Sequence, residues 1–209
     1  MANDITESKI MQVLNWTYDK AVNGVTGLDS AVDLAQSYMK NESSLVDQAN
    51  SLIRWQNTKA GTAGFLTGLG GLMTMPVSLP ANITSVMYVQ VRMVAAIAHM
   101  GGYDLKDDQV KTLVFTCLVG NAAKDILKDI GIVVGKKMTE NAIKNISGKT
   151  ITKINKIVGF RLLTKFGKTG AINLGKMIPI MGGIVGATFD SVTTNQIGNT
   201  ARRLFIEQK

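Results

Sequence analysis

The longest stretch without a charged side chain is the feature that most limits how this chain can fold. From Ala60 to Val91 the sequence contains no Asp, Glu, Lys, Arg or His. That run exceeds the roughly 20 residues with which an α-helix crosses a bilayer. Pro76 and Pro80 interrupt it, however, and glycine recurs along it, so that each piece is about long enough to half span or barely span a membrane. We therefore expect an apolar helical hairpin over residues 61–100.

Three environments fit this hairpin. A helix in the centre of a soluble bundle is apolar on all sides, and glycines let its neighbours approach closely. A hairpin that enters a membrane also fits, because Gly64 and Gly68 have the spacing of small residues that pack helices in lipid. The third environment is the wall of a site for a hydrophobic ligand. Arg92 favours the soluble bundle, since a guanidinium is costly in lipid. The glycines expected at helix contacts are Gly64, Gly68, Gly70, Gly71, Gly182 and Gly186.

Helical periodicity describes the rest of the chain, and no alternating stretch is long enough to be a strand. Helices are expected over residues 5–22, 28–39, 107–117, 122–130 and 147–166, from Ser43 or Ser44 onward, and at the C-terminal end. Asp47 follows Ser44 at the spacing of a capping box. The predicted fold class is all-α, a compact multi-helix bundle with a central apolar glycine-rich hairpin.

Positive charge is concentrated in the second half of the chain. Residues 1–103 carry 6 Lys or Arg and 7 Asp or Glu, whereas the remainder carry 17 and 8. Between Lys136 and Lys176 ten basic residues accompany Glu140 as the one acid. Such a block attracts polyanions, which include an anionic membrane surface, nucleic acid and an acidic partner. Nucleic acid is the least favoured, because the block is rich in lysine and has no recognition-fold signature.

Within the basic block, the helix expected over residues 147–166 is amphipathic. Ile151, Ile154, Val158 and Leu162 share one face, and three lysines lie roughly opposite. This pattern is typical of a helix that lies on an anionic membrane or on an acidic partner, and equally of the solvated outer face of a bundle helix. The candidate lipid- or anion-binding residues are Lys149, Lys153, Lys156, Arg161, Lys165 and Lys168.

No recognisable catalytic, cofactor or metal site is present in the sequence. The Gly-Lys-Thr sequences at 148–150 and 167–169 are not phosphate-binding loops, because each lacks the glycine that such a loop requires five residues before the glycine of Gly-Lys-Thr. The single Cys117 permits neither an internal disulfide nor a cysteine-rich metal site. One possible polar cluster consists of Arg92, His99 and Asp104. It would act as an acid–base or anion site, or alternatively its charged groups would form a structural ion pair.

Several of these segments together resemble a bacterial family. Thr67-Gly68-Leu69-Gly70-Gly71-Leu72, Pro76, Leu79-Pro80 and Gly101-Gly102-Tyr103-Asp104-Leu105 are similar to the EcsC family, as are the C-terminal Gly182–Gly186 and Ala201–Phe205. The resemblance covers residues 45–209, which leaves 1–44 as an N-terminal helical extension packed with that domain. It implies a role near a membrane, since the best known member is encoded beside an ABC transporter. It carries over no catalytic residues, and Ser78 stands where many members have an acid.

These observations lead to one main hypothesis and two alternatives. The main hypothesis is a non-enzymatic helical protein that binds an anionic lipid surface or a membrane partner such as a transporter. Its expected location is the cytoplasm, peripheral at the inner face of the cytoplasmic membrane, because the polar N-terminus lacks the pattern of a signal peptide. The alternatives are a membrane-disrupting effector or toxin and a small hydrolase or hydrophobic-ligand-binding protein.

Overall fold

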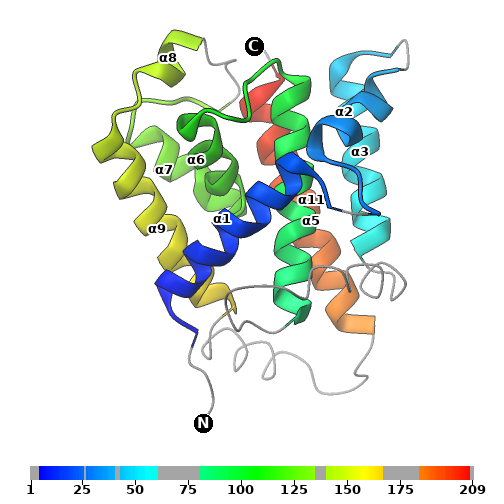
Figure 1. Ribbon diagram of the computed structural model, residues 1–209, viewed down its shortest axis with the longest axis horizontal. Coiled ribbons are helices and arrows are strands. Elements are labelled where there is room, and N and C mark those ends of the chain that lie inside the picture. The colour runs from blue at the N-terminus through cyan, green and yellow to red at the C-terminus, as the bar shows by residue number, and fades with distance from the viewer. Residues whose placement is uncertain are drawn as a thin grey trace.

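The structure is a computed structural model that describes residues 5–25, 27–40, 43–60, 81–134, 140–166 and 184–207. The described residues are helical and include no β-strand, which confirms the predicted all-α class (Figure 1). Their only β-type pairing is an isolated bridge between Val25 and Leu28. The helices are α1 (Glu7–Asn23), α2 (Ala31–Met39), α3 (Leu45–Ala60), α5 (Ala81–Met100), α6 (Asp108–Cys117), α7 (Ala123–Lys128), α8 (Glu140–Lys144), α9 (Gly148–Phe166) and α11 (Ile184–Phe205).

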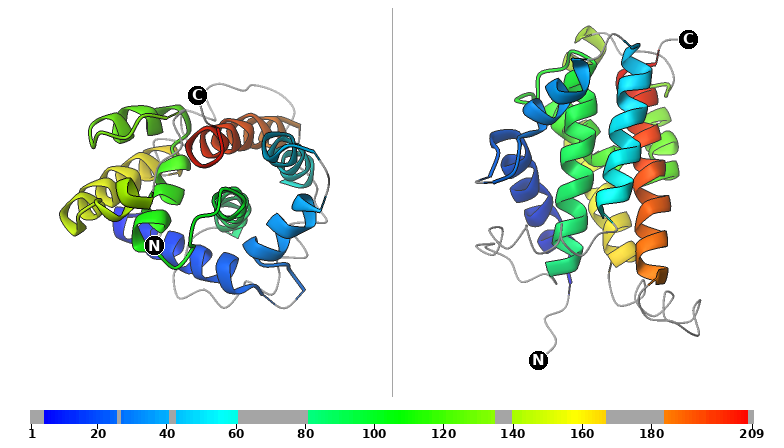
Figure 2. Two further views of the ribbon diagram at one scale, coloured as in Figure 1. Left: turned by 90° about the horizontal axis from the view of Figure 1, so that it is seen from above. Right: turned by 90° about the vertical axis from the view of Figure 1, so that its right-hand side faces the viewer.

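Helix α5 is the centre of the bundle, and the other helices surround it (Figure 2). It packs against α1, α2, α3, α6 and α11, and α9 lies outside this first ring, against α1 and α6. Among the described residues, Ile83–Met100 is the one stretch that is long and apolar enough to cross a membrane by length and composition, and 83% of it is buried within the protein. Core helices of soluble proteins meet the same description because they are apolar all round.

The first part of the expected hairpin lies outside the described residues. That part includes Gly64, Gly68, Gly70 and Gly71. Gly182 also lies outside them, whereas Gly186 belongs to the first turn of α11. The second part of the hairpin is α5, which is a buried central helix.

Polar caps fix where the early helices begin. Ser30 and Asp33 form a reciprocal capping box, so α2 begins at Ala31, three residues later than periodicity predicts. Helix α3 begins directly after Ser44, as predicted, since the Ser44 hydroxyl oxygen accepts a hydrogen bond from the Asp47 backbone N–H at 3.2 Å. Its hydroxyl also donates to the Asp47 carboxylate at 2.6 Å. These local bonds satisfy backbone donors that a helix start leaves free.

Two glycines shape the end of α5. Gly102 has φ +87°, and the amides of Gly102 and Tyr103 donate to the carbonyls of His99 and Ala98 at 2.9 and 3.2 Å. This is the left-handed glycine cap that ends many helices. At Gly101 a Cβ would lie 2.4 Å from the carbonyl oxygen of Phe205, so no larger residue fits there. The Gly-Gly pair therefore both stops α5 and lets the end of α11 pack against it.

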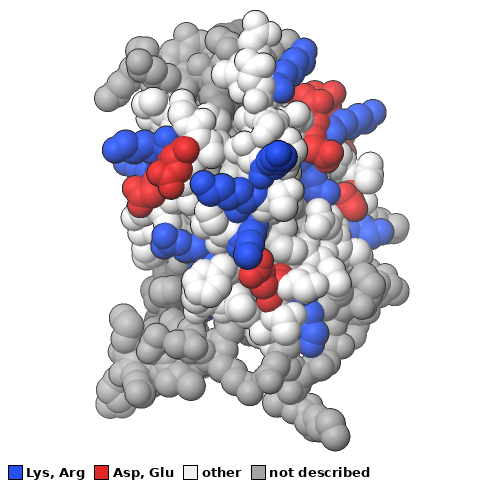
Figure 3. Space-filling view, turned by 90° about the vertical axis from the view of Figure 1, so that its left-hand side faces the viewer, with Lys and Arg blue, Asp and Glu red and all other residues white. Residues whose placement is uncertain are grey.

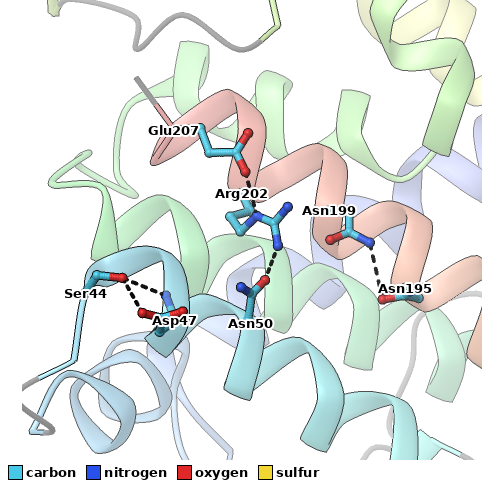
Figure 4. Close-up of polar contacts among 7 residues, drawn as sticks. All are labelled: Ser44, Asp47, Asn50, Asn195, Asn199, Arg202 and Glu207. Atoms are coloured by element: carbon cyan, nitrogen blue, oxygen red, sulfur yellow. Dashed lines mark hydrogen bonds and ion pairs between the residues drawn. The ribbon is translucent and has the colours of Figure 1, made fainter. Parts of the chain in front are cut away.

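Helix α11 is tied to α3 and α5 by polar contacts as well as by packing. The Arg202 guanidinium donates to Glu207 at 3.0 Å and to the Asn50 side chain on α3 (Figure 4). On α5, the Gln90 amide donates to the Thr194 hydroxyl at 3.1 Å. A Cβ at Gly198 would lie 2.7 Å from Ile53, which shows how closely α3 and α11 approach.

The chain between α6 and α9 breaks where the sequence predicts. Helix α6 ends at Cys117, a 3₁₀ turn covers Gly120–Ala122, and α7 follows. Gly120 has φ +61°, a conformation that favours glycine. The five-residue α8 is not predicted by periodicity, because it is too short to show any.

Candidate functional site

The inner face of α9 holds this helix against the bundle. Ile154, Val158 and Leu162 are buried there, as the sequence predicts, and Ile151 is half-buried. Gly159 lies on the same side, where a Cβ would be 2.8 Å from Cγ of Glu7 on α1. Buried apolar side chains and a close glycine contact therefore fix which face of α9 points outward.

The outer face of α9 carries most of the predicted basic site. Lys149, Lys153, Lys156 and Arg161 are all exposed, and α9 contains no Asp or Glu. The structure thus exposes four of the six candidate residues: Lys149, Lys153 and Lys156 share one outward side, and Arg161 lies at its border, about a third of a turn around the helix. Lys165 is half-buried, with its Nζ 5.0 Å from the centre of the Phe166 ring. Lys168 lies outside the described residues.

An aromatic side chain lies within this basic face. Phe160 is 57% exposed, four residues after Lys156 and therefore on the same side of the helix. Ile157, three residues before it, is half-buried. Sequence reasoning missed Phe160 as a surface residue, although its spacing from the lysines was the available signal.

We define the basic face as the exposed side chains of Lys149, Lys153, Lys156, Phe160 and Arg161. Figure 3 shows the side of the molecule that lies on the left in Figure 1, where α9 is located, with lysine and arginine side chains down its middle. Acidic side chains lie toward both edges of this view, next to further basic side chains, and one acidic group lies in the middle directly below the central basic side chains (Figure 3). The central basic side chains therefore outnumber the acidic ones beside them, although acidic side chains border them.

Arg92 lies in the interior, away from the other two members of the possible polar cluster. It is 4% exposed, and one of its terminal nitrogens donates to the backbone carbonyl of Asp29 at 3.2 Å. Its guanidinium carbon lies 5.7 Å from the centre of the Tyr88 ring, a cation–π distance. Its Nε has no hydrogen-bond partner in the described part of the chain. Arg92 therefore links α5 to the segment before α2.

His99 and Asp104, by contrast, line one cavity. Its volume is about 340 Å³, and its wall also includes Val22, Val32 and the loop residues 102–106. A second cavity, of about 290 Å³, shares Gly102, Tyr103 and Asp104 with the first and is also lined by Asp107 and Lys144 among others. The structure thus brings two of the three predicted residues together and leaves Arg92 out of both linings.

The loop of residues 102–106, which contributes to both cavities, is fixed to α1. The Tyr18 hydroxyl donates to the backbone carbonyl of Leu105 at 2.8 Å. Burial, assisted by the nearby negative charge of Asp104, raises the pKa of Tyr18 well above its usual range. Tyr18 therefore stays a neutral donor near pH 7 and holds the loop in place.

Cys117 is an interior side chain. It is fully buried in α6, and burial raises the pKa of its thiol well above the ordinary value. A neutral buried thiol is a poor nucleophile, so Cys117 packs as a small apolar residue. No group of three or more His, Cys, Asp or Glu side chains placed to hold a metal ion occurs among the residues that the structure describes.

Comparison with known proteins identifies one relationship. The model of the EcsC protein family matches residues 2–206 of this chain. The match begins before α1, so it includes the two N-terminal helices as well as the segments whose motifs carry the resemblance. No curated protein and no solved structure matches the chain.

Proposed function

We propose that this chain, which belongs to the EcsC family, is a non-enzymatic protein that attaches to an anionic membrane surface through the basic face of α9. The observation that carries the proposal is the combination of three exposed lysines and an exposed phenyl ring on one outward face of α9, with the exposed Arg161 at its border and no acid on the helix. The proposed location is the inner face of the cytoplasmic membrane, where anionic headgroups are exposed to the cytoplasm.

The charges on this face supply attraction. A lysine or arginine near an anionic leaflet contributes about 1 kcal/mol, so the four cations together contribute about 4 kcal/mol. This attraction falls off within a Debye length of about 10 Å at moderate salt. Attachment by α9 is therefore reversible and sensitive to salt.

Phe160 supplies a contribution that salt does not screen. A phenyl ring that moves from water to the acyl boundary removes apolar area from water, at roughly 25 cal/mol per Å². Its position between Lys156 and Arg161 lets the ring enter lipid while the cations remain at headgroup level. Amphipathic helices that lie in the interface combine the same two elements.

The burial of α5 favours peripheral attachment over insertion. Its apolar side chains already pack against five other helices, so exposing them to lipid requires the bundle to open. Attachment through α9 needs no such change, because the basic face is exposed in the folded protein. A membrane-disrupting protein would need the opening.

Co-sedimentation with lipid vesicles tests the proposal. The full chain should bind vesicles that contain phosphatidylglycerol and should not bind phosphatidylcholine vesicles, and high salt should weaken the binding. The variant Lys153→Glu with Lys156→Glu should lower the affinity at least about a hundredfold, because two attractions become repulsions. The matched control Lys124→Glu with Lys128→Glu reverses two exposed lysines on α7 and should leave binding nearly unchanged.

Phe160→Ala separates the two contributions. It should weaken vesicle binding about tenfold at both low and high salt, since it removes apolar contact and no charge. Equal binding to neutral and anionic vesicles, or no binding to either, contradicts the proposal. Release of an entrapped dye by the wild-type chain contradicts peripheral attachment and favours the membrane-disrupting alternative.

A further inference from the structure

The cavity at the C-terminal end of α5 combines an apolar wall with charged groups at its mouth. Val22 from α1 and Val32 from α2 are half-buried, and Leu105 is 5% exposed; these three side chains form the aliphatic wall. Asp104 and Lys106 also line the cavity and are exposed. A volume of about 340 Å³ lies within the range of small-molecule sites, and such sites commonly pair apolar walls with a few polar groups.

Charges of both signs surround this cavity, and Asp104 is its negatively charged side chain. Asp104 forms no ion pair among the described residues; one of its carboxylate oxygens accepts a hydrogen bond from the Lys106 backbone N–H at 2.9 Å. Both α1 and α5 end beside the cavity, since Val22 and His99 lie in their last turns. Helix C-termini carry partial negative charge, which adds to that of the carboxylate, whereas Val32 belongs to the first turn of α2, whose N-terminus is partly positive.

Hydrogen-bonding capacity in this cavity favours a cation. The second carboxylate oxygen of Asp104 is available as an acceptor, and charge-assisted hydrogen bonds to an ammonium are roughly twice as strong as neutral ones. The imidazole of His99 is half-buried in the same wall and, when neutral, has a nitrogen that accepts a hydrogen bond. No hydrogen bond within the described chain occupies this ring.

We propose that this cavity binds a small molecule with a primary ammonium group on a short branched aliphatic chain. The ammonium donates to Asp104 and His99, and the aliphatic chain packs against Val22, Val32 and Leu105. Two sources share this chemistry, a simple aliphatic amine and an α-amino acid. In the second, the ligand carboxylate faces the ammonium of Lys106 at the mouth of the cavity. The cavity includes no residue of α9, so this proposal is independent of membrane attachment.

Amide NMR titration of the full chain tests the proposal with matched ligands. Isopentylammonium should give saturable shifts at Gly102, Lys106 and Val32, whereas 4-methylpentanoate, which has the same alkyl chain and the opposite charge, should not. Sodium chloride at equal concentration controls for ionic strength. L-leucine distinguishes the sources: binding tighter than that of isopentylammonium identifies an amino-acid site, and weaker binding identifies an amine site.

Two variants decide whether Asp104 holds the ammonium. Asp104→Asn keeps the acceptor for the Lys106 amide but removes the charge, and it should weaken isopentylammonium binding about tenfold. Asp107→Asn is the matched control, because Asp107 lines the neighbouring cavity and its side chain makes no capping hydrogen bond to α6. Equal shifts with the amine and the carboxylate, no saturable shift with any of the three ligands, or unchanged affinity in Asp104→Asn overturns the proposal.

Discussion

Helices α5 and α9 are nearly equal in length, at 20 and 19 residues, yet the fold uses them in opposite ways. Helix α5 contains the end of the uncharged stretch, and α9 lies in the basic block. Helix α5 is enclosed on all sides, whereas α9 packs by one face and presents its cations to solvent. The long apolar stretch of α5 therefore indicates burial in the protein. The surface helix α9 is the one that is available to contact a partner.

The polar side chains of the two helices differ in the same way. On α5, Gln90 is paired with Thr194 of α11, and a terminal nitrogen of Arg92 donates to a backbone carbonyl, so both side chains have a partner inside the protein, although the Arg92 Nε has none among the described residues. A buried polar group without a partner costs free energy. On α9, Lys153 and Lys156 reach solvent, where hydration satisfies them. Only the second arrangement leaves charge available for recognition.

Truncating one large apolar side chain on each helix gives the largest expected contrast. Ile97→Ala on α5 should lower the free energy of unfolding by about 2–5 kcal/mol, because Ile97 is fully buried and the change leaves a cavity. Phe160→Ala on α9 should change it by less than about 0.5 kcal/mol, since the ring is largely exposed. Urea denaturation followed by circular dichroism measures both. Similar losses would mean that Phe160 is a structural residue.

Helix α1 packs against both α5 and α9 and contains Tyr18. Because of Tyr18, the free energy of unfolding of the protein should depend on pH in the alkaline range. The folded state raises the pKa of Tyr18 above its unfolded value of about 10. The unfolded state therefore releases this proton first, and stability falls as pH rises above that value, by up to about 1.4 kcal/mol per pH unit. Below it the contribution is constant.

Tyr18→Phe tests that assignment. The variant loses the hydrogen bond to Leu105 at every pH, but its unfolding free energy should fall less steeply above about pH 10 than that of the wild type. Part of the slope should remain, because burial also raises the pKa values of Tyr38 and Tyr88. Urea denaturation at a series of pH values gives the two slopes. Identical slopes would exclude Tyr18 as the source.

Local patterns predicted the all-α fold and the orientation of α9. The inward Ile154, Val158 and Leu162 and the outward lysines follow from residue spacing alone, because a helix that packs by one face must turn its apolar side inward. The same residue spacing could have identified Phe160 as an exposed residue beside the lysines. Attachment to a membrane stays a prediction, which the vesicle experiments decide.

Contacts between distant segments could not be predicted. The cavity draws Val22, Val32 and His99 from three helices, and nothing in the sequence around each indicates the other two. Gly101 is required by the carbonyl of Phe205, which is more than a hundred residues away in the chain. Arg92 also has the correct helical spacing to join His99, but tertiary packing directs it to Asp29.

A small change on the inner face of α9 should cost more than a large change on its outer face. Gly159→Ala adds a methyl group whose carbon would lie 2.8 Å from Glu7 and 3.2 Å from Met11, so these side chains must move. Because they are flexible, the expected loss of unfolding free energy is about 1 kcal/mol, the lower end for overpacking. Thermal denaturation measures it. The control is Gly148→Ala, where a Cβ would meet nothing within 4 Å.

The smallest expected effect on folding comes from reversing charge on the basic face. Lys153→Glu with Lys156→Glu should change the free energy of unfolding by less than about 0.5 kcal/mol, because both side chains are exposed and form no ion pair within the described chain. Urea denaturation at low and high salt measures the change. The same double variant is expected to lose vesicle binding, so unchanged stability would assign these lysines to recognition alone. A large loss of stability would instead mean that they support the fold, and the contrast between α5 and α9 would then lose its functional meaning.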